Sequence, residues 1–110
     1  MKRVLVTGGA GFIGSNLIKQ LLIDFPNVFI VSLDNYLTGT EENHVEHTNL
    51  TYLKGNTWDI EDYTDVPFDT VFHFGEYSRI VKSFDDVNYV MKTNLHGTTR
   101  ILEMCRKWNA

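Results

Sequence analysis

Closely spaced glycines near the start of the chain limit its possible folds more than any other feature. They stand at positions 8, 9, 11 and 14, directly after a short apolar run at residues 3–7. The spacing matches GxxGxxG at Gly8, Gly11 and Gly14, and also GxGxxG at Gly9, Gly11 and Gly14. In such a segment glycine allows a tight turn, a close approach of the backbone to a pyrophosphate, and close packing of helix on strand. The pattern therefore predicts a strand, a turn and a helix whose N-terminus faces phosphate groups.

Hydrophobic periodicity extends this unit into a series of strands and helices. Apolar residues recur at helical spacing over residues 12–24, and Pro26 stands just beyond them as a stop signal. Residues 34–49 are polar and predict a long surface loop with one helical turn near Glu41, and residues 55–64 predict a loop or a helical turn. Short β-branched or apolar runs predict strands at residues 3–7, 28–33, 50–54 and 70–74.

The last predicted element is the longest helix. Ser83, with Asp86 three residues later, is typical of a helix start. The polar residues Asn94 and Thr98 fall on the apolar face, so we expect each to find a hydrogen-bond partner in the protein backbone or in a ligand. That apolar face is marked by Val87, Val90, Met91, Leu95, Ile101, Leu102 and Cys105.

The order of these elements predicts the fold class. Strands that alternate with helices or long connections are typical of an α/β protein, and right-handed crossovers place the strands in the order 3-2-1-4. We therefore expect a Rossmann-type, doubly wound parallel sheet that stops after about four strands. Residues 1–110 are interpreted as one dinucleotide-binding domain. A fifth strand is the next element expected, so we interpret the sequence as the N-terminal fragment of a larger protein.

An acidic residue at the end of the second predicted strand indicates which dinucleotide binds. Asp34 follows Gly14 by 20 residues, which is the distance at which a carboxylate accepts hydrogen bonds from the adenosine ribose. The same carboxylate would repel the 2′-phosphate of NADP, and no Arg directly follows it. The sequence therefore predicts NAD as the cofactor. A P-loop is excluded because the glycine segment lacks the GK[ST] ending.

Composition and charge argue against several other functions. The net charge is −4 and the ten Lys and Arg residues are scattered, so we expect no nucleic-acid partner. No apolar run approaches the ~18 residues of a membrane span, so we expect no membrane partner. Cys105 is the only cysteine, which precludes an internal disulfide and leads us to expect a cytoplasmic protein.

Four groups of residues carry a resemblance to a known family. They are TGGAGFIGSNL at 7–17 followed by LDN at 33–35, GNTWDI at 55–60, DTVFHFG at 69–75, and TNLHGT at 93–98. Together they resemble the extended short-chain dehydrogenases/reductases, and among these the NAD-dependent epimerases and dehydratases of nucleotide sugars. The resemblance covers the whole chain, and the order and spacing of the motifs make it far more specific than the glycine segment alone.

The resemblance implies a set of cofactor-binding residues. The glycine segment would present its backbone to the pyrophosphate, and Asp34 and Asn35 would hold the adenosine ribose. Asp59 and Ile60 would flank adenine, and Asn94 would turn toward the cofactor or the adjoining loop. Phe74 and Gly75, at the end of the fourth predicted strand, would border the cofactor. The full set is Gly8, Gly11, Phe12, Ile13, Gly14, Asp34, Asn35, Asp59, Ile60, Phe74, Gly75 and Asn94.

The resemblance also implies an enzyme. In the nucleotide-sugar epimerases and dehydratases, NAD transiently takes a hydride from a sugar carbon and returns it. The implied partner of the intact protein is a nucleotide-sugar substrate, and the implied assembly is a homodimer. Two alternatives stay open: an extended-family reductase or dehydrogenase that acts on a non-sugar substrate, and a non-catalytic NAD-binding fragment.

The catalytic residues of the family are expected outside this chain. The family uses a Ser or Thr together with a Tyr-x-x-x-Lys pair, whose Tyr acts as a general base. No Tyr of this sequence has a Lys four residues later. We therefore expect no catalytic residue among these 110 residues, and no turnover by the chain alone.

The sequence departs from the family directly after the fourth strand. Many relatives have small residues after the position of Phe74, whereas this chain has a charge and an aromatic in the segment GEYSR at 75–79. Because of this difference, the motifs do not specify which substrate the protein binds. Arg79 either meets a substrate phosphate or carboxylate, or pairs with Glu76 or Asp85.

Three other candidates have simple structural interpretations. His44 and His47 have HxxH spacing but lie in a polar loop without a third ligand, so no metal site is expected. His73 is interpreted as a packed, hydrogen-bonded residue beside the cofactor cleft rather than as a catalytic base. Cys105 is interpreted as a core residue.

Overall fold

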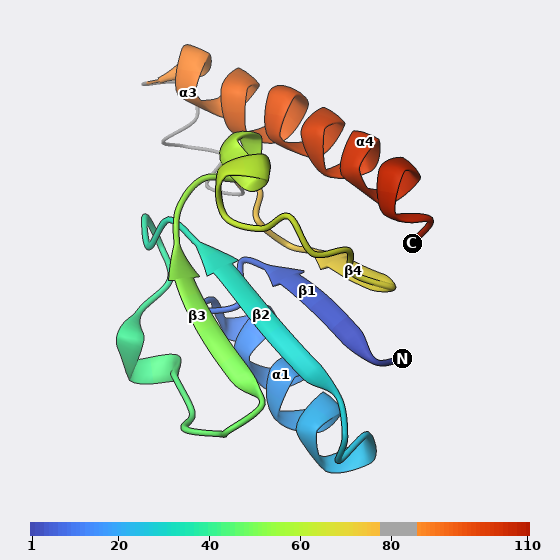
Figure 1. Ribbon diagram of the computed structural model, residues 1–110. Helices are drawn as coiled ribbons and strands as arrows, with labels where there is room; N and C mark the ends of the chain where they lie inside the picture. The colour runs from blue at the N-terminus through green and yellow to red at the C-terminus, as the bar shows by residue number, and fades with distance from the viewer. Residues whose placement is uncertain (78–85) are drawn as a thin grey trace.

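A parallel sheet of four strands is the centre of the computed structural model, which describes residues 1–77 and 86–110. The strand order is β3-β2-β1-β4, and every neighbouring pair is parallel (Figure 1). The predicted α/β class and the order 3-2-1-4 are therefore confirmed. The strands are β1 at Arg3–Thr7, β2 at Phe29–Asp34, β3 at Leu50–Lys54 and β4 at Thr70–His73.

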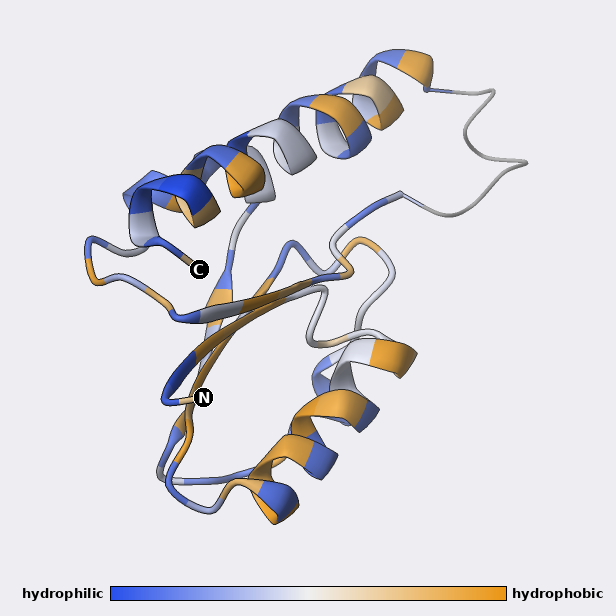
Figure 2. Ribbon diagram, turned by 90° about the vertical axis from the view of Figure 1, so that its right-hand side faces the viewer, coloured by the Kyte–Doolittle hydropathy of each residue, from blue (hydrophilic) through white to orange (hydrophobic). Residues whose placement is uncertain are grey.

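Helices cover both faces of this sheet. The helix α1, Phe12–Asp24, lies on one face. The opposite face is covered by the short 3₁₀ segment η2, Thr57–Asp62, and by the helix α4, Thr98–Trp108. Figure 2 shows the sheet edge-on between α1 and the C-terminal helices. The architecture therefore has three layers, as the alternation of strands and helices predicts.

The core lies on both sides of β1, the strand between β2 and β4. Val4, Leu5 and Val6 have no exposed surface. Because successive side chains of a strand point to opposite faces, Val4 and Val6 pack with Ile18 of α1, and Leu5 packs with Ile101 of α4. A strand buried on both faces explains the continuous apolar run of the sequence at this point.

Most element boundaries agree with the sequence. The predicted helix at 12–24 and the predicted strands at 3–7 and 50–54 are confirmed. The predicted strand at 28–33 lies one residue later, because the Val28 N–H donates to the Phe25 carbonyl in the preceding turn (3.0 Å) and Asp34 still pairs with Lys54. The strand predicted at 70–74 ends at His73. The helical turn predicted near Glu41 is the 3₁₀ segment η1, Glu41–Asn43.

The predicted last helix consists of three consecutive segments. They are α3 at Val87–Met91, the π-helical η3 at Lys92–Gly97, and α4. Asp86 caps α3, since its side chain accepts a hydrogen bond from the Tyr89 N–H at 3.0 Å. Ser83, the other half of the predicted start, lies outside the described residues.

The predicted apolar face of this helix is largely exposed. Val87, Met91, Leu95 and Leu102 are each at least half exposed, and only Ile101 of the predicted set is fully buried. The buried residues of this region are Thr93, Gly97, Ile101 and Met104.

Two isoleucines of α1 provide a matched test of this packing. Ile18 is fully buried between α1 and the sheet, whereas Ile23 is 71% exposed. We expect Ile18→Ala to lower the free energy of unfolding by about 2–5 kcal/mol, because it leaves a cavity in the core. Ile23→Ala should change it by less than about 0.5 kcal/mol. Urea unfolding of both variants measures this, and equal losses would contradict the packing of α1 described here.

Candidate functional site

The glycine segment folds as a tight turn between β1 and α1. Gly8 has a φ of +73°, in the left-handed region that glycine adopts without strain. A Cβ on Gly8 would lie 2.8 Å from the carbonyl carbon of Phe74, so this turn and the end of β4 touch through their backbones. A Cβ on Gly14 would overlap the carbonyl oxygen of Gly8. Glycine at both positions therefore lets α1 begin directly beside the sheet, with the free N–H groups of its first turn beyond the strand ends.

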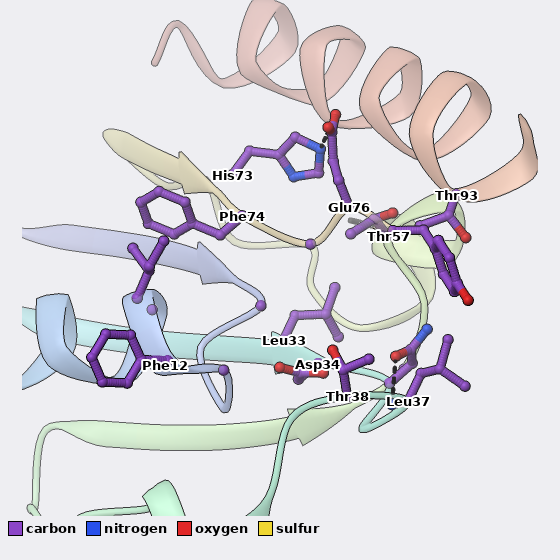
Figure 3. A pocket seen from close by; sticks show the side chains of 18 of the residues that line it. Phe12, Leu33, Asp34, Leu37, Thr38, Thr57, His73, Phe74, Glu76 and Thr93 are labelled. Atoms are coloured by element: carbon purple, nitrogen blue, oxygen red, sulfur yellow. Dashed lines mark hydrogen bonds and ion pairs between the residues drawn. The ribbon is translucent and has the colours of Figure 1, made fainter. Parts of the chain in front are cut away.

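A cleft of about 720 Å³ lies at the carboxyl ends of the strands (Figure 3). Its volume is typical of a small-molecule site. In open parallel sheets ligands bind at this edge, where the strand order reverses, and here it reverses between β1 and β4. The cleft brings together most of the predicted cofactor-binding residues, namely Gly8, Gly11, Phe12, Ile13, Gly14, Asp34, Asn35, Phe74 and Gly75.

The remaining predicted residues do not line the cleft. Ile60 is 1% exposed and packs in the core beneath α4. Asp59 lies in η2, where its N–H donates to the Asn56 carbonyl at 3.1 Å. After β3 the cleft is lined instead by Gly55, Thr57 and Trp58. The contact of Asp59 and Ile60 with adenine stays a prediction.

Asp34 joins the glycine turn to the loop after β2. The residue is only 9% exposed. Its Oδ2 accepts a hydrogen bond from the Ala10 N–H at 3.0 Å, and its Oδ1 accepts one from the Tyr36 N–H at 2.8 Å. Each carboxylate oxygen can accept a further hydrogen bond. Asp34 can therefore hold the two loops and still accept a hydroxyl from the cleft.

Asn35 is engaged by the protein itself. Its Nδ2 donates to the Asn56 Oδ1 at 3.1 Å and to the Tyr89 hydroxyl at 2.7 Å, while its Oδ1 accepts from the Leu37 N–H at 3.0 Å. These bonds connect the loops after β2 and β3 with α3. The predicted contact of Asn35 with the ribose stays a prediction.

Asn94 holds the loop after β4. Its Oδ1 accepts from the Tyr77 N–H at 2.6 Å, and its Nδ2 donates to the Tyr77 carbonyl at 3.0 Å. Of the two orientations expected for Asn94, the structure shows the one toward the adjoining loop. A contact of Asn94 with the cofactor stays a prediction.

His73 lies beside the cleft and uses both ring nitrogens. Nδ1 is 2.6 Å from the Thr7 Oγ1, and Nε2 is 2.9 Å from the Thr98 Oγ1. Burial lowers the pKa of His73, and the nearby Glu76 carboxylate offsets this only in part. The neutral imidazole is therefore favoured, in agreement with the interpretation of His73 as a packed, hydrogen-bonded residue.

Three aromatic residues, Trp58, Tyr77 and Tyr89, line the cleft, and of these the sequence placed only Tyr77 beside the site. The Tyr89 ring lies edge-to-face with the Trp58 ring at 6.2 Å and with the Tyr77 ring at 5.9 Å. The Lys92 Nζ is 4.8 Å from the centre of the Trp58 ring. Trp58 falls inside the GNTWDI motif, so its position was a usable signal. Nothing in the local sequence indicates that Tyr89 would reach the cleft from α3.

The other candidates from the sequence have different outcomes. His44 stacks on Tyr52 with the ring centres 3.6 Å apart, and its Nε2 is 2.7 Å from the Tyr36 hydroxyl. Within residues 1–77 and 86–110, no three His, Cys, Asp or Glu residues form a group that could hold a metal ion, and no helix is long and apolar enough to span a membrane. Cys105 is half-buried beside the core. Arg79 and Asp85 lie outside the described residues.

The buried imidazole predicts a pH dependence of stability. Because the pKa of His73 is lower in the folded than in the unfolded protein, the unfolded state takes up the proton first as the pH falls below about 6.5. We expect the unfolding free energy to fall between pH 7.5 and 5.5, and His73→Gln to reduce this fall. His47→Gln, in an exposed loop, is the control. Urea unfolding at both pH values measures the difference, and equal slopes for all three proteins would contradict the prediction.

The sequence of the chain is similar to those of known proteins. The family model described as GDP-mannose 4,6 dehydratase matches residues 5–110. The chain is 34% identical to UDP-glucuronic acid decarboxylase 4 of Arabidopsis thaliana over 109 residues, which are 98% of this chain and 24% of that protein.

Solved structures agree with this match. An epimerase from Methanothermobacter thermautotrophicus superposes with a TM-score of 0.88 at 33% identity, over 97% of this chain and 32% of that one. The enzyme WbmH of Bordetella bronchiseptica, in complex with NAD⁺, superposes with a TM-score of 0.86 at 30% identity, over 99% of this chain and 36% of that one. The chain thus spans about a quarter to a third of the length of these relatives.

Proposed function

The chain belongs to the NAD-dependent epimerase/dehydratase family of extended short-chain dehydrogenases/reductases, and we propose that it is the NAD-binding part of a nucleotide-sugar epimerase or dehydratase. The observation that carries the proposal is the cleft at which the glycine turn, the N-terminus of α1 and Asp34 converge. The WbmH complex with NAD⁺ supports the choice of cofactor. The nucleotide sugar named for the Arabidopsis decarboxylase supports the substrate class.

The residues at the start of α1 fit a pyrophosphate. A Cβ on Gly8 or Gly14 would collide with neighbouring backbone, so glycine at both positions keeps the turn at the start of α1 tight. The first turn of α1 contains no acidic residue, so the free N–H groups and the positive end of the helix dipole can attract an anion. Phe12 and Ile13, whose side chains are mostly exposed, would present these N–H groups to the phosphates.

The opposite side of the cleft fits an adenosine. Asp34 would accept hydrogen bonds from the ribose hydroxyls, and its negative charge would disfavour the 2′-phosphate of NADP. Trp58, which also lines the cleft, offers an apolar ring surface. Thr57 and Thr93 also line the cleft, but in the described part of the chain their hydroxyl oxygens are buried away from it.

The chemistry of the intact protein follows from the family. NAD, when bound, supplies a hydride acceptor that can return the hydride to the same substrate. The residues of this chain would bind and orient the cofactor at the end of β4, where Phe74 and Gly75 border the cleft. The proton-transfer residues, a Ser or Thr and a Tyr-x-x-x-Lys pair, would lie outside these 110 residues.

Asp34 provides the test of cofactor binding. We expect the protein to bind NAD more tightly than NADP, as measured by isothermal titration calorimetry. Asp34→Asn should weaken NAD binding by about tenfold or more and reduce the preference for NAD, because it removes charge-assisted hydrogen bonds of about 1.5–3 kcal/mol.

The control for Asp34→Asn is Asp24→Asn, which makes the same change at the exposed end of α1. It should leave both affinities unchanged. Because Asp34 also holds Ala10 and Tyr36, the thermal midpoint of each variant is measured alongside. A wild-type protein that binds neither dinucleotide, or that prefers NADP, would overturn the proposed cofactor.

Turnover by the chain itself provides a second test. With NAD and UDP-glucose or GDP-mannose, we expect no epimer and no 4-keto product above the level without protein, because the catalytic pair is absent from the sequence. Chromatography of the nucleotide sugars after incubation measures this. Product formation would show that residues of this chain perform the proton transfer, and would contradict the assignment of that step to residues beyond it.

A further inference from the structure

A closed path of hydrogen bonds connects Glu76 with the end of β1. We propose that Glu76 is a positioning residue: acting through Thr98, it determines which nitrogen of His73 carries the proton and thereby the direction of the buried Thr7 hydroxyl, whose oxygen accepts the N–H of the cleft residue Gly75. Glu76 is one of the residues at which the sequence departs from the family pattern. Only the last step of the proposal, the effect on cofactor affinity, rests on the proposed function.

The carboxylate of Glu76 is turned toward α4 rather than across the cleft (Figure 3). Its Oε1 accepts a hydrogen bond from the Thr98 hydroxyl at 2.7 Å and lies 3.7 Å from the His73 Nε2. The His73 side chain is 16% exposed and that of Glu76 is 47% exposed. The Glu76 carboxylate at one end of the path is therefore partly exposed to solvent, whereas the His73 imidazole in the middle is largely buried.

The direction of the first bonds follows from the carboxylate. A carboxylate only accepts hydrogen bonds, so Thr98 donates its single hydroxyl proton to Glu76. Thr98 then has no proton left for the imidazole, and the 2.9 Å bond must be donated by the His73 Nε2–H. A neutral imidazole carries one proton, which leaves Nδ1 of His73 as an acceptor.

The remaining bonds continue in the same direction. Because Nδ1 of His73 is an acceptor, Thr7 donates its hydroxyl proton across the 2.6 Å contact. The Thr7 oxygen in turn accepts the Gly75 N–H at 2.9 Å. The path thus begins at the amide of Gly75 and ends at the side chain of Glu76, its neighbour in sequence. Every hydrogen bond in the path donates in the direction of Glu76. The path connects residues of β1, β4 and α4.

Without the Glu76 carboxylate, the direction of donation in these hydrogen bonds would no longer be determined. Without Glu76, the Thr98 hydroxyl is free to donate to the His73 Nε2. The imidazole proton can then sit on Nδ1 and be donated to Thr7, whose own proton must turn elsewhere. The buried Thr7 hydroxyl, whose oxygen accepts the N–H of the cleft residue Gly75, would then alternate between two arrangements.

The test reads the two ring nitrogens of His73 directly. In ¹⁵N-labelled protein at pH 7.5 without ligand, we expect ¹⁵N chemical shifts of a protonated Nε2 and an unprotonated Nδ1, assigned by their loss in His73→Gln. In Glu76→Ala both shifts should move toward intermediate values. Thr98→Val should have the same effect, whereas Thr98→Ser keeps the hydroxyl and should restore the wild-type shifts. Glu61→Ala removes a carboxylate of similar exposure that pairs with Arg100, also on α4, and should leave the shifts unchanged.

Cofactor affinity is measured on the same variants. If two arrangements are about equally populated, only half of the protein is competent, and the NAD dissociation constant of Glu76→Ala should rise by about twofold. Unchanged His73 shifts in both Glu76→Ala and Thr98→Val would overturn the proposal. Changed shifts with unchanged NAD affinity would overturn the positioning role at the cleft. Failure of the wild-type protein to bind NAD would overturn the proposed function, while the ligand-free shifts would still decide whether Glu76 sets the proton position.

Discussion

The backbone contact between Gly8 and Phe74 fixes the geometry on which the site depends. It brings the turn after β1 within van der Waals distance of the loop after β4, at the point where the strand order reverses. No side chain fits between them, because a Cβ on Gly8 would lie 2.8 Å from the Phe74 carbonyl. The same closeness lets Thr7 reach both His73 and Gly75. A residue larger than glycine at position 8 would separate the two halves of the cleft.

Polar side chains of β2 and η3 hold the loops around the cleft. Asp34 binds the backbone of the loops on either side of it, and Asn94 binds both backbone polar groups of Tyr77. These loops have little apolar surface to bury, so side-chain to backbone hydrogen bonds take the place of core packing. A consequence is that substitutions at Asp34 or Asn35 change the shape of the cleft together with its contacts to a ligand.

The sequence was sufficient for the fold because the signals for the fold are local. Strand runs, the helical period of α1 and the glycine spacing each depend on neighbouring residues, and right-handed crossovers then determine the strand order. The π-helical turn at Lys92–Gly97, where Gly97 packs closely against Thr57, was not indicated by the sequence pattern.

The candidate site likewise contains residues that local sequence signals predicted and residues that they did not. The glycine turn and Asp34 were predictable, because their positions follow from the ends of β1 and β2. The lining after β3 was only partly predictable: Trp58 lies within the GNTWDI motif, but the 3₁₀ segment η2 buries Ile60 in the core, away from the cleft. Tyr89 belongs to α3, and sequence spacing does not specify that α3 lies beside the cleft.

The two tryptophans report on different parts of the molecule. Trp58 borders the cleft beneath Tyr89 and Lys92, and Trp108 packs against Phe68 at the other end of α4, with ring centres 5.2 Å apart. The intrinsic fluorescence of the protein therefore contains one emitter that senses the cleft and one that senses the core. Replacing either with phenylalanine would separate the optical signal of ligand binding from that of unfolding, without an added dye.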